Sequence, residues 1–240
     1  MLATVTPPSD PDCGAVALEF CEVSVLGEDG RSRLHAVTIA AFSGVVTVVA
    51  GPSGAGKSTL LRLGNGLDRP SSGEVRFMGC DITSIDMRDL RRRVGMVFQR
   101  PIPFPGTVRN NLGVVDSEAG EEQMLDALDR VGLAASFLDR PADDLSGGEC
   151  QRMCIARALM TFPEVLLMDE PTTALDPENR FAIERLAATL TDQGLAVIWV
   201  SHDLEQVRRI GQQVIVLTEG RLATPEQAAD YLRDRSGDTL

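Results

Sequence analysis

Several features that would assign this sequence to other protein classes are missing. Its five cysteines are odd in number and form no Cys-x-x-Cys pair, which argues against a disulfide framework and favours a reducing, cytoplasmic compartment. The N-terminus has neither the basic segment nor the apolar core of a signal peptide. We therefore expect residues 1–15 to form a disordered lead and residues 16–240 to form one domain.

Long apolar runs are also absent. The longest uncharged apolar run, residues 36–50, is broken by Ser43 and Gly44. It is too short to cross a bilayer, and it predicts a pair of strands instead. A function at a membrane would therefore require a second chain that provides the membrane-spanning part.

An excess of positive charge is missing too. The net charge of −12 disfavours binding to nucleic acid, because phosphate backbones repel such a chain unless it carries a concentrated basic face. The only basic run, residues 88–93, predicts a solvated turn before a strand. Cys150 and Cys154 could share one face of a helix, but without a nearby histidine they predict small core residues and not a zinc site.

What the sequence does contain is an alternation of strand-like and helical segments. Short runs rich in β-branched residues occur at 45–50, 94–98, 165–169, 196–200 and 214–217. Helical patterns lie between many of them, at 57–67, 121–133, 149–160 and 177–190. Buried strands that alternate with helices predict an α/β domain built on a parallel sheet.

Two regions depart from this alternation. The strand-like segments 16–25, 33–42 and 74–78, the first two separated by the turn Gly-Glu-Asp-Gly at 27–30, predict an antiparallel side sheet. The stretch that begins at residue 100 contains proline-rich loops and a helix but no clear strand. We expect it to form a small helical subdomain, over about residues 100–160, inserted in the core.

The segment Gly-Pro-Ser-Gly-Ala-Gly-Lys-Ser-Thr at 51–59 follows a strand-like run and precedes a helical one. It matches the P-loop pattern, whose glycines let backbone N–H groups surround phosphates at a helix N-terminus. Lys57 should reach the β- and γ-phosphates, the Ser58 hydroxyl should hold Mg²⁺, and Thr59 should support the α-phosphate. The alternative is a glycine-rich turn with an incidental lysine. The candidate nucleotide-binding residues here are Gly51, Pro52, Ser53, Gly54, Ala55, Gly56, Lys57, Ser58 and Thr59.

Two carboxylates, Asp169 and Glu170, stand at the end of the strand-like run 165–169. A strand exit beside a P-loop is where Mg²⁺ and an attacking water would sit. Asp169 suits the Mg²⁺ shell, through Ser58 or a bridging water, and Glu170 suits polarisation of the water that attacks the γ-phosphate. Taken alone, Asp-Glu-Pro would be an ordinary strand-to-loop exit.

The segment Leu-Ser-Gly-Gly-Glu at 145–149 places two glycines at the start of a helix, where each costs roughly 0.5–1 kcal/mol relative to alanine. Ser146 and Glu149 form a Ser-x-x-Glu capping box, which predicts Ser146 as the N-cap and Gly147 and Gly148 as bare backbone at an anion site. The P-loop of the same chain already holds a triphosphate. A second phosphate cradle is therefore useful if it covers the γ-phosphate of a nucleotide held by another copy.

These segments, in this order, resemble the ATP-binding cassette (ABC) ATPases over roughly residues 16–223. The resemblance implies a P-loop NTPase fold, with a RecA-like parallel core sheet, an antiparallel side sheet and a small helical subdomain. It also implies a head-to-tail dimer of this chain with a second copy or with a similar ATPase. Two ATP molecules would lie at the interface, each between the P-loop of one copy and Ser146–Glu149 of the other.

The resemblance also assigns roles to residues that carry no signal by themselves. Gln99 would bind Mg²⁺ or water, His202 would contact the γ-phosphate, and Asp176, in the D-loop 174–176, would organise the dimer contact. Taken alone, Gln99 would be a polar strand end and His202 a loop histidine. The expected catalytic residues are thus Glu170, His202 and Gln99, and the expected Mg²⁺ ligands are Ser58, Gln99 and Asp169.

Two positions depart from the family pattern. Leu26 and Gly27 stand where the family usually has an aromatic residue that stacks on adenine. Such stacking contributes about 0.5–1.5 kcal/mol beyond burial, so we expect weaker selectivity for the base. Glu149 replaces the commoner glutamine but still caps the helix, so we expect no loss of activity.

Within the family, a single cassette with a compact helical insertion and no coiled coil favours the separate ATPase subunit of a transporter. It would lie at the cytoplasmic face of the cell membrane and act on a transmembrane permease subunit. The loop 98–112 resembles that of phosphate-import ATPases, and its context is also similar to ATPases of iron or metal efflux; we favour phosphate or a related inorganic ion. A soluble regulatory or mechanical ABC ATPase is a further alternative, whereas a P-loop kinase would leave residues 145–149 and His202 unexplained.

Overall fold

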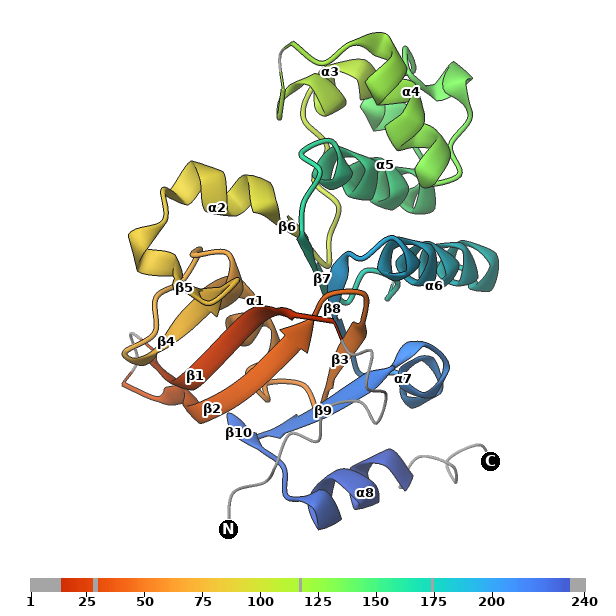
Figure 1. Ribbon diagram of the computed structural model, residues 1–240. Coiled ribbons are helices and arrows are strands. Elements are labelled where there is room, and N and C mark those ends of the chain that lie inside the picture. Colours follow the sequence, from red (N-terminus) through yellow and green to blue (C-terminus); the bar gives the residue numbers. More distant parts are fainter. Residues whose placement is uncertain (1–13, 28–29, 117, 174, 234–240) are drawn as a thin grey trace.

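The computed structural model describes residues 14–27, 30–116, 118–173 and 175–233 (Figure 1). The predicted lead over residues 1–15 lies outside these ranges except for its last two residues. Of those two, Ala15 is tied to the domain, because its carbonyl oxygen accepts a hydrogen bond of 3.0 Å from the Ser43 N–H.

A six-stranded core sheet forms the centre of the molecule, in the order β10-β9-β3-β8-β7-β6. Its strands are β3 (Val46–Ala50), β6 (Val94–Val97), β7 (Val165–Asp169), β8 (Ala196–Ser201), β9 (Gln213–Thr218) and β10 (Arg221–Leu222). All pair in parallel except β10, which is antiparallel to β9. Every residue of β3, β7 and β8 is buried, which is why these segments are apolar without alternation. The predicted parallel sheet is confirmed.

A second, antiparallel sheet lies beside the core sheet, in the order β2-β1-β4-β5 (Figure 1). It consists of β1 (Val16–Leu26), β2 (Ser32–Phe42), β4 (Ser72–Phe77) and β5 (Cys80–Asp81), and the predicted side sheet is confirmed. Two residues of the predicted turn between β1 and β2 lie outside the described ranges. The Gly30 N–H nevertheless donates to the Gly27 carbonyl at 2.9 Å, as in a tight turn.

Helices cover the core sheet and divide its packing into two hydrophobic clusters. On one face, α1 (Lys57–Gly64) packs between the core sheet and the side sheet, and α2 (Met87–Arg93) leads into β6. On the other face lie α6 (Pro177–Asp192) and α7 (Leu204–Ile210), and the last helix, α8 (Pro225–Arg233), follows β10. The parallel strands therefore end in loops at one common edge of the core sheet.

The helical subdomain projects from the core sheet, at the top of Figure 1, and contains α3 (Val108–Gly113), α4 (Glu121–Arg130) and α5 (Gly147–Leu159). Short 3-10 helices span Ala135–Phe137 and Ala142–Asp144, and a third, Ile82–Ser84, follows β5. The three α-helices, α3, α4 and α5, fall within the expected segment 100–160. The sequence predicted one helix before residue 145 and missed α3, whose only ordinary sequence signal is a cap. Thr107 and Asn110 form that cap as a reciprocal capping box.

The basic run 88–93 is a correction to the sequence prediction. It forms the helix α2 and not a turn, because the Asp86 side chain accepts hydrogen bonds from the N–H groups of Arg88 and Asp89 and so caps the helix. Arg93 pairs with Glu164 at 2.6 Å and lies over the Phe77 ring. The predicted core role of Cys150 and Cys154 is confirmed, since both are buried between helices of the subdomain and the core.

Candidate active site

The segment 51–56 between β3 and α1 is tightly packed at the edge where the parallel strands end. Gly51 has a φ of +146°, and a Cβ atom there would lie 2.1 Å from the Leu217 backbone oxygen on β9. Gly56 has a φ of +96°, and a Cβ there would lie 2.6 Å from the Arg33 carbonyl oxygen. Glycine is therefore required at both positions. Gly56 is also the N-cap residue of α1. Because glycine has no side chain, the first N–H groups of the helix find no side-chain hydrogen-bond acceptor in the N-cap residue and stay available to a ligand.

Lys57, the first residue of α1, is buried with only 6% of its surface exposed. Its Nζ donates hydrogen bonds of 2.8 Å to the backbone oxygens of Gly51 and Pro52, which holds the ammonium inside the curve of the P-loop. Burial lowers the pKa of Lys57, and the nearby carboxylates of Glu170 and Asp169 raise it again in part. The loop thus surrounds one buried positive charge.

Asp169, the last residue of β7, meets the next residue of α1. The Ser58 hydroxyl donates to Asp169 Oδ1 at 3.0 Å, although 111 residues separate the two in the sequence. Burial raises the pKa of Asp169, the Ser58 hydrogen bond lowers it, and Glu170 raises it further. A buried carboxylate beside a hydroxyl is an arrangement of hard oxygen donors that suits Mg²⁺. The two residues expected to hold the metal from opposite elements are therefore in contact.

Glu170 is the meeting point of the remaining expected catalytic residues. Its Oε2 accepts hydrogen bonds from Gln99 Nε2 at 3.2 Å and from the Thr173 hydroxyl at 3.0 Å. Its Oε1 lies 3.1 Å from His202 Nδ1. The backbone of Glu170 adopts a φ of +43°, which is uncommon for a residue with a side chain and turns the carboxylate out of the sheet edge. The structure thus brings Gln99, Glu170 and His202 together.

One pocket of about 750 Å³ is lined by Lys57, Ser58, Gln99, Glu170 and His202, whereas Asp169 lies behind Ser58 and is not part of its lining. The sequence predicted most of its lining and missed Arg33 on β2, Thr173 and Tyr231 on α8. Thr173 adjoins the predicted Asp-Glu-Pro segment and could have been found there. Arg33 and Tyr231 reach the pocket only through the packing of β2 and α8, and no local motif marks them. Leu26, where the family has an aromatic, is 59% exposed.

The segment 145–149 forms the predicted capped helix start, on α5 in the helical subdomain. Ser146 Oγ accepts from the Glu149 N–H at 3.3 Å, and Glu149 Oε2 accepts from the Ser146 N–H at 2.7 Å. The hydrogen bonds from Ser146 lower the pKa of Glu149, and Arg140, at 3.5 Å, lowers it further. Among the described residues, none of this segment lines the P-loop pocket. One chain therefore keeps apart the two segments that the sequence predicts to bind phosphate.

The two glycines of this segment have different surroundings. A Cβ atom on Gly148 would lie 2.8 Å from Asn179 Cγ on α6, so a close approach explains the second glycine. A Cβ on Gly147 would meet nothing within 4 Å. Asn179 is held in turn by Asp176, whose side chain caps α6 through the Asn179 N–H at 3.0 Å. Ala174, in the predicted D-loop, lies outside the described residues.

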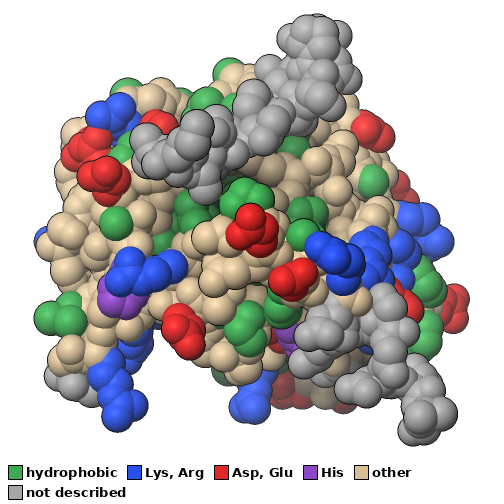
Figure 2. Space-filling model, turned by 90° about the horizontal axis from the view of Figure 1, so that it is seen from below, with side chains coloured by type: hydrophobic (Ala, Val, Ile, Leu, Met, Phe, Trp, Pro, Cys, Tyr) green, Lys and Arg blue, Asp and Glu red, His purple; other side chains and the backbone are tan. Residues whose placement is uncertain are grey.

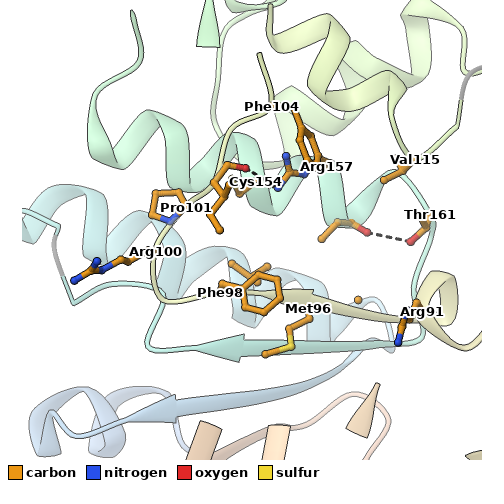
Figure 3. Close-up of a pocket in the computed structure, with 14 residues that line it drawn as sticks. Arg91, Met96, Phe98, Arg100, Pro101, Phe104, Val115, Cys154, Arg157 and Thr161 are labelled. Carbon is orange, nitrogen blue, oxygen red and sulfur yellow. Dashed lines mark hydrogen bonds between the residues drawn. The ribbon is translucent and has the colours of Figure 1, made fainter. Parts of the chain in front are cut away.

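A second pocket, of about 320 Å³, lies between β6 and α5 (Figure 3). Met96 and Phe98 line one side of it, and Phe104 lies on the opposite side, where the guanidinium of Arg157 on α5 is 4.5 Å from the centre of the Phe104 ring. Phe98 and Phe104 are each more than 40% exposed, and Ile102 on the same loop is 61% exposed. The loop 98–112, singled out in the sequence, thus carries an exposed apolar surface.

Comparisons with known proteins relate the chain to one protein family. Residues 34–173, more than half of the chain, match the family model described as ABC transporter. The chain is 40% identical over 206 residues to ABC transporter I family member 17 of Arabidopsis thaliana, covering 84% of this chain and 78% of that protein. It is 38% identical over 214 residues to phosphate import ATP-binding protein PstB 2 of Natronomonas pharaonis, covering 82% of this chain and 75% of that protein. It is also 40% identical over 234 residues to methionine import ATP-binding protein MetN of Caulobacter vibrioides, covering 92% of this chain and 70% of that protein.

Solved structures have the same fold. CbiO1 of Clostridium perfringens, described as part of the ABC transporter complex CbiONQ, gives a TM-score of 0.79 at 31% identity, covering 90% of this chain and 91% of that one. The ATP-binding cassette MJ0796, as a dimer in a post-hydrolysis state bound to ADP and Pi, gives 0.76 at 32% identity, covering 85% and 96%. The mixed sheets and helices described above are thus those of a P-loop NTPase with an antiparallel side sheet. Within the described ranges, every helix is too short or too polar to span a membrane.

Proposed function

The chain belongs to the ABC transporter family of ATPases, and from this premise we propose that it hydrolyses ATP to drive solute transport through a separate membrane subunit. The observation that carries the proposal is the convergence on Glu170. Gln99, Thr173 and His202 all contact its carboxylate, in the same pocket as the buried ammonium of Lys57. A carboxylate beside a P-loop is placed to polarise a water for attack on the γ-phosphate.

Each side of the pocket has a part in this proposal. Residues 51–59 hold the phosphates, with Lys57 as the cation that faces the β- and γ-phosphates. Ser58, Asp169 and Gln99 would hold Mg²⁺, because their hydroxyl, carboxylate and amide oxygens are the donors that this ion prefers. The ion would supply positive charge beside the phosphates and would offset the burial that raises the pKa of Asp169. His202 contacts the γ-phosphate from the loop after β8.

We further propose that two copies, or this chain and a similar ATPase, close head to tail over two ATP molecules. The support is that Ser146, Gly147, Gly148 and Glu149 stand on the helical subdomain, away from the pocket of their own chain. Gly147 has open space around it, as an element that receives a ligand from another molecule requires. A helix start of this kind offers backbone N–H groups to a phosphate.

The experiment is the substitution Glu170→Gln. It removes the charge that polarises the water but keeps an amide that can hydrogen-bond to Gln99, so ATP should bind and remain uncleaved. We expect the variant to form a stable dimer with Mg-ATP, seen as a doubling of mass in light scattering, while its hydrolysis falls at least about 100-fold.

The matched control is Lys57→Ala combined with Glu170→Gln, which should stay monomeric because the nucleotide is no longer held. A Glu170→Gln variant that is monomeric with saturating Mg-ATP, under conditions in which the wild type dimerises, would contradict the proposed hydrolytic site.

We propose that the membrane subunit docks at the pocket between β6 and α5. The exposed apolar side chains Phe98, Ile102 and Phe104 support this, because contiguous exposed apolar surface marks interaction sites. The pocket is bounded by residues on both sides of the connection between core and helical subdomain (Figure 3). A partner seated there would sense any rotation of the subdomain against the core. This chain would then lie at the cytoplasmic face of the membrane as a peripheral protein.

For the solute we propose phosphate or a related inorganic ion, on the strength of the loop 98–112 and of the likeness to a phosphate import ATP-binding protein. Import of methionine and efflux of iron or another metal are the competing solutes. On the face in Figure 2, acidic and basic side chains are interspersed over the described part, so this face gives no support for a nucleic-acid partner.

Copurification separates the transporter from a soluble regulatory or mechanical ATPase. A multi-span membrane protein should be recovered with this chain from solubilised membranes, and ATP hydrolysis by that complex should rise with the transported solute. If phosphate stimulates this hydrolysis, the proposed solute is supported. If methionine or a metal ion does so instead, that compound is the solute and phosphate is not. Full hydrolytic activity with recovery of a soluble complex alone would favour the mechanical ATPase.

A further inference from the structure

A buried polar network lies behind the catalytic loops and is not explained by nucleotide binding. Its centre is Gln206 on α7, which is 2% exposed. Gln206 Nε2 donates hydrogen bonds to the Thr172 hydroxyl at 2.9 Å and to Glu184 Oε1 at 2.8 Å, and its Oε1 accepts from Trp199 Nε1 at 3.2 Å. One amide therefore joins three elements, β8, α6 and the loop after β7.

All partners of Gln206 are buried. Trp199 is fully buried, Thr172 is 4% exposed and Glu184 is 6% exposed. Glu184 is paired in addition with Arg209, through hydrogen bonds of 2.9 and 3.1 Å. Buried polar groups need partners, and a fully satisfied network of this kind fixes the elements that it joins. The network therefore has one arrangement, and moving one member displaces the others.

Two members of the network adjoin catalytic residues. Thr172 stands two residues after Glu170, in the turn closed by the hydrogen bond from the Thr173 N–H to the Glu170 carbonyl at 3.3 Å. Gln206 lies in the first turn of α7, which begins directly after His202 and Asp203. Asp203 caps that helix by accepting from the Gln206 N–H at 3.1 Å, and it pairs with Arg180 of α6 at 2.9 Å.

We propose that Thr172 and Gln206 are positioning residues for hydrolysis, which fix the loop of Glu170 to the helix that follows His202. Neither side chain lines the P-loop pocket, so neither touches the nucleotide. Their contact sets the relation between two loops that must address the same phosphate. The inference rests on the proposed function, and it adds that the carboxylate and the histidine are held as one unit from behind.

The test is Thr172→Val, which removes the hydroxyl and retains the branched shape. Trp199 and Glu184 keep their bonds to Gln206, and only the link to the Glu170 loop is lost. We expect kcat for ATP to fall about tenfold, since small misplacements of a catalytic group cost up to about 100-fold. KM and the affinity for a fluorescent ATP analogue should stay within about twofold, because the phosphate cradle is untouched. Thr172→Ser should restore kcat.

Trp199 supplies a signature that loss of stability would not produce. It is the only tryptophan of the chain, and its indole N–H is bonded to Gln206. In the wild type, Mg-ATP should shift the single indole N–H resonance, because contacts at Glu170 are passed through Thr172 to Gln206. In Thr172→Val, ATP should bind with no such shift.

The control for stability is Ile183→Val on α6, a buried position next to Glu184 that has no polar bond to lose. It should lower the melting temperature slightly and leave kcat and the indole shift unchanged. Wild-type kcat in Thr172→Val, or a loss that Ile183→Val reproduces at equal stability, would overturn the positioning role. A wild-type protein that itself fails to hydrolyse ATP would instead overturn the proposed function.

Discussion

The two helix starts that this fold offers to phosphates, those of α1 and α5, are built in opposite ways. The start of α1 has a glycine N-cap in the left-handed conformation, no side-chain cap, no acidic residue in its first turn, and the buried ammonium of Lys57. The start of α5 is closed by its own capping box and carries the acidic Glu149. Each helix start provides a partial positive charge of about half a unit, which Lys57 reinforces at α1 and Glu149 opposes at α5.

This difference shows why the two motifs have unequal parts in one chain. The α1 site can hold an anion by itself, with a lysine and backbone donors that surround it. The α5 site can offer the N–H groups of its diglycine turn and the Ser146 hydroxyl, beside a carboxylate that repels phosphate. We infer that α5 recognises a phosphate only when a second P-loop delivers it already neutralised. In the proposed dimer, the P-loop is therefore the binder of the nucleotide, and the start of α5 is the cover that closes over it.

The largest effect expected from this comparison is that of Lys57→Ala. Hydrolysis should fall at least about 100-fold, and binding of ATP to the isolated chain should be lost, because the only cation in the loop is removed. Release of inorganic phosphate measures hydrolysis, and titration with a fluorescent ATP analogue measures binding. The equivalent truncation at α5, Ser146→Ala, should reduce hydrolysis but leave binding to the isolated chain within about twofold. Equal loss of binding in the two variants would erase the distinction between binder and cover.

A medium effect is expected within the diglycine turn itself. Gly148→Ala places a Cβ 2.8 Å from Asn179 Cγ and should destabilise the fold by about 1–3 kcal/mol, because the Asn179 side chain, which is hydrogen-bonded to the α6 cap Asp176, must shift. Gly147→Ala meets nothing and should stabilise α5 by up to about 1 kcal/mol while obstructing the partner nucleotide. Urea unfolding measures the stability of both variants, and ATP-dependent dimerisation measures the obstruction caused by Gly147→Ala. The opposite order of stability would mean that α6 does not approach Gly148 in solution.

The smallest effect is expected for Glu149→Gln, since glutamine also completes the capping box. The pKa of Glu149 is lowered in the folded chain, so its charged form stabilises the fold above the unfolded pKa of about 4.3, and this contribution is lost as the pH falls through the folded pKa. The wild type should therefore exceed the variant in stability by less than about 1 kcal/mol at pH 7, and the difference should vanish below about pH 3. Chemical unfolding at both pH values checks this.

The sequence sufficed for the segments whose local pattern and final structure agree. The buried strands were visible as apolar runs, the side sheet as alternation, and the capping box of α5 as Ser-x-x-Glu. It failed at α2 and α3 because both are short and polar. Of the α2 residues only Leu90 is buried, so no apolar period marks the helix. In α3 a single apolar pair, Val108 and Leu112, is buried, and the fully buried Asn111 bonds to the backbone of Phe104.

The meeting of the catalytic residues could not have been worked out from local patterns. Gln99 and Glu170 are 71 residues apart and touch because β6 and β7 are neighbours in the core sheet. His202 joins them because β8 pairs with β7. Their order along the chain identified them through a family resemblance, and the sheet topology supplies the physical reason. Arg33 and Tyr231 had no such order to reveal them.

The ammonium that bonds to the oxygens of Gly51 and Pro52 belongs to the only lysine in the chain, since all other basic side chains except the two histidines are arginines. Reagents that acylate primary amines, which label most proteins at many surface points, have here one side-chain target, at the centre of the nucleotide pocket. The label found on Lys57, measured separately from that on the N-terminal amine, should therefore fall as ATP fills the pocket. Acylation of this lysine would then report the fraction of pockets that hold ATP.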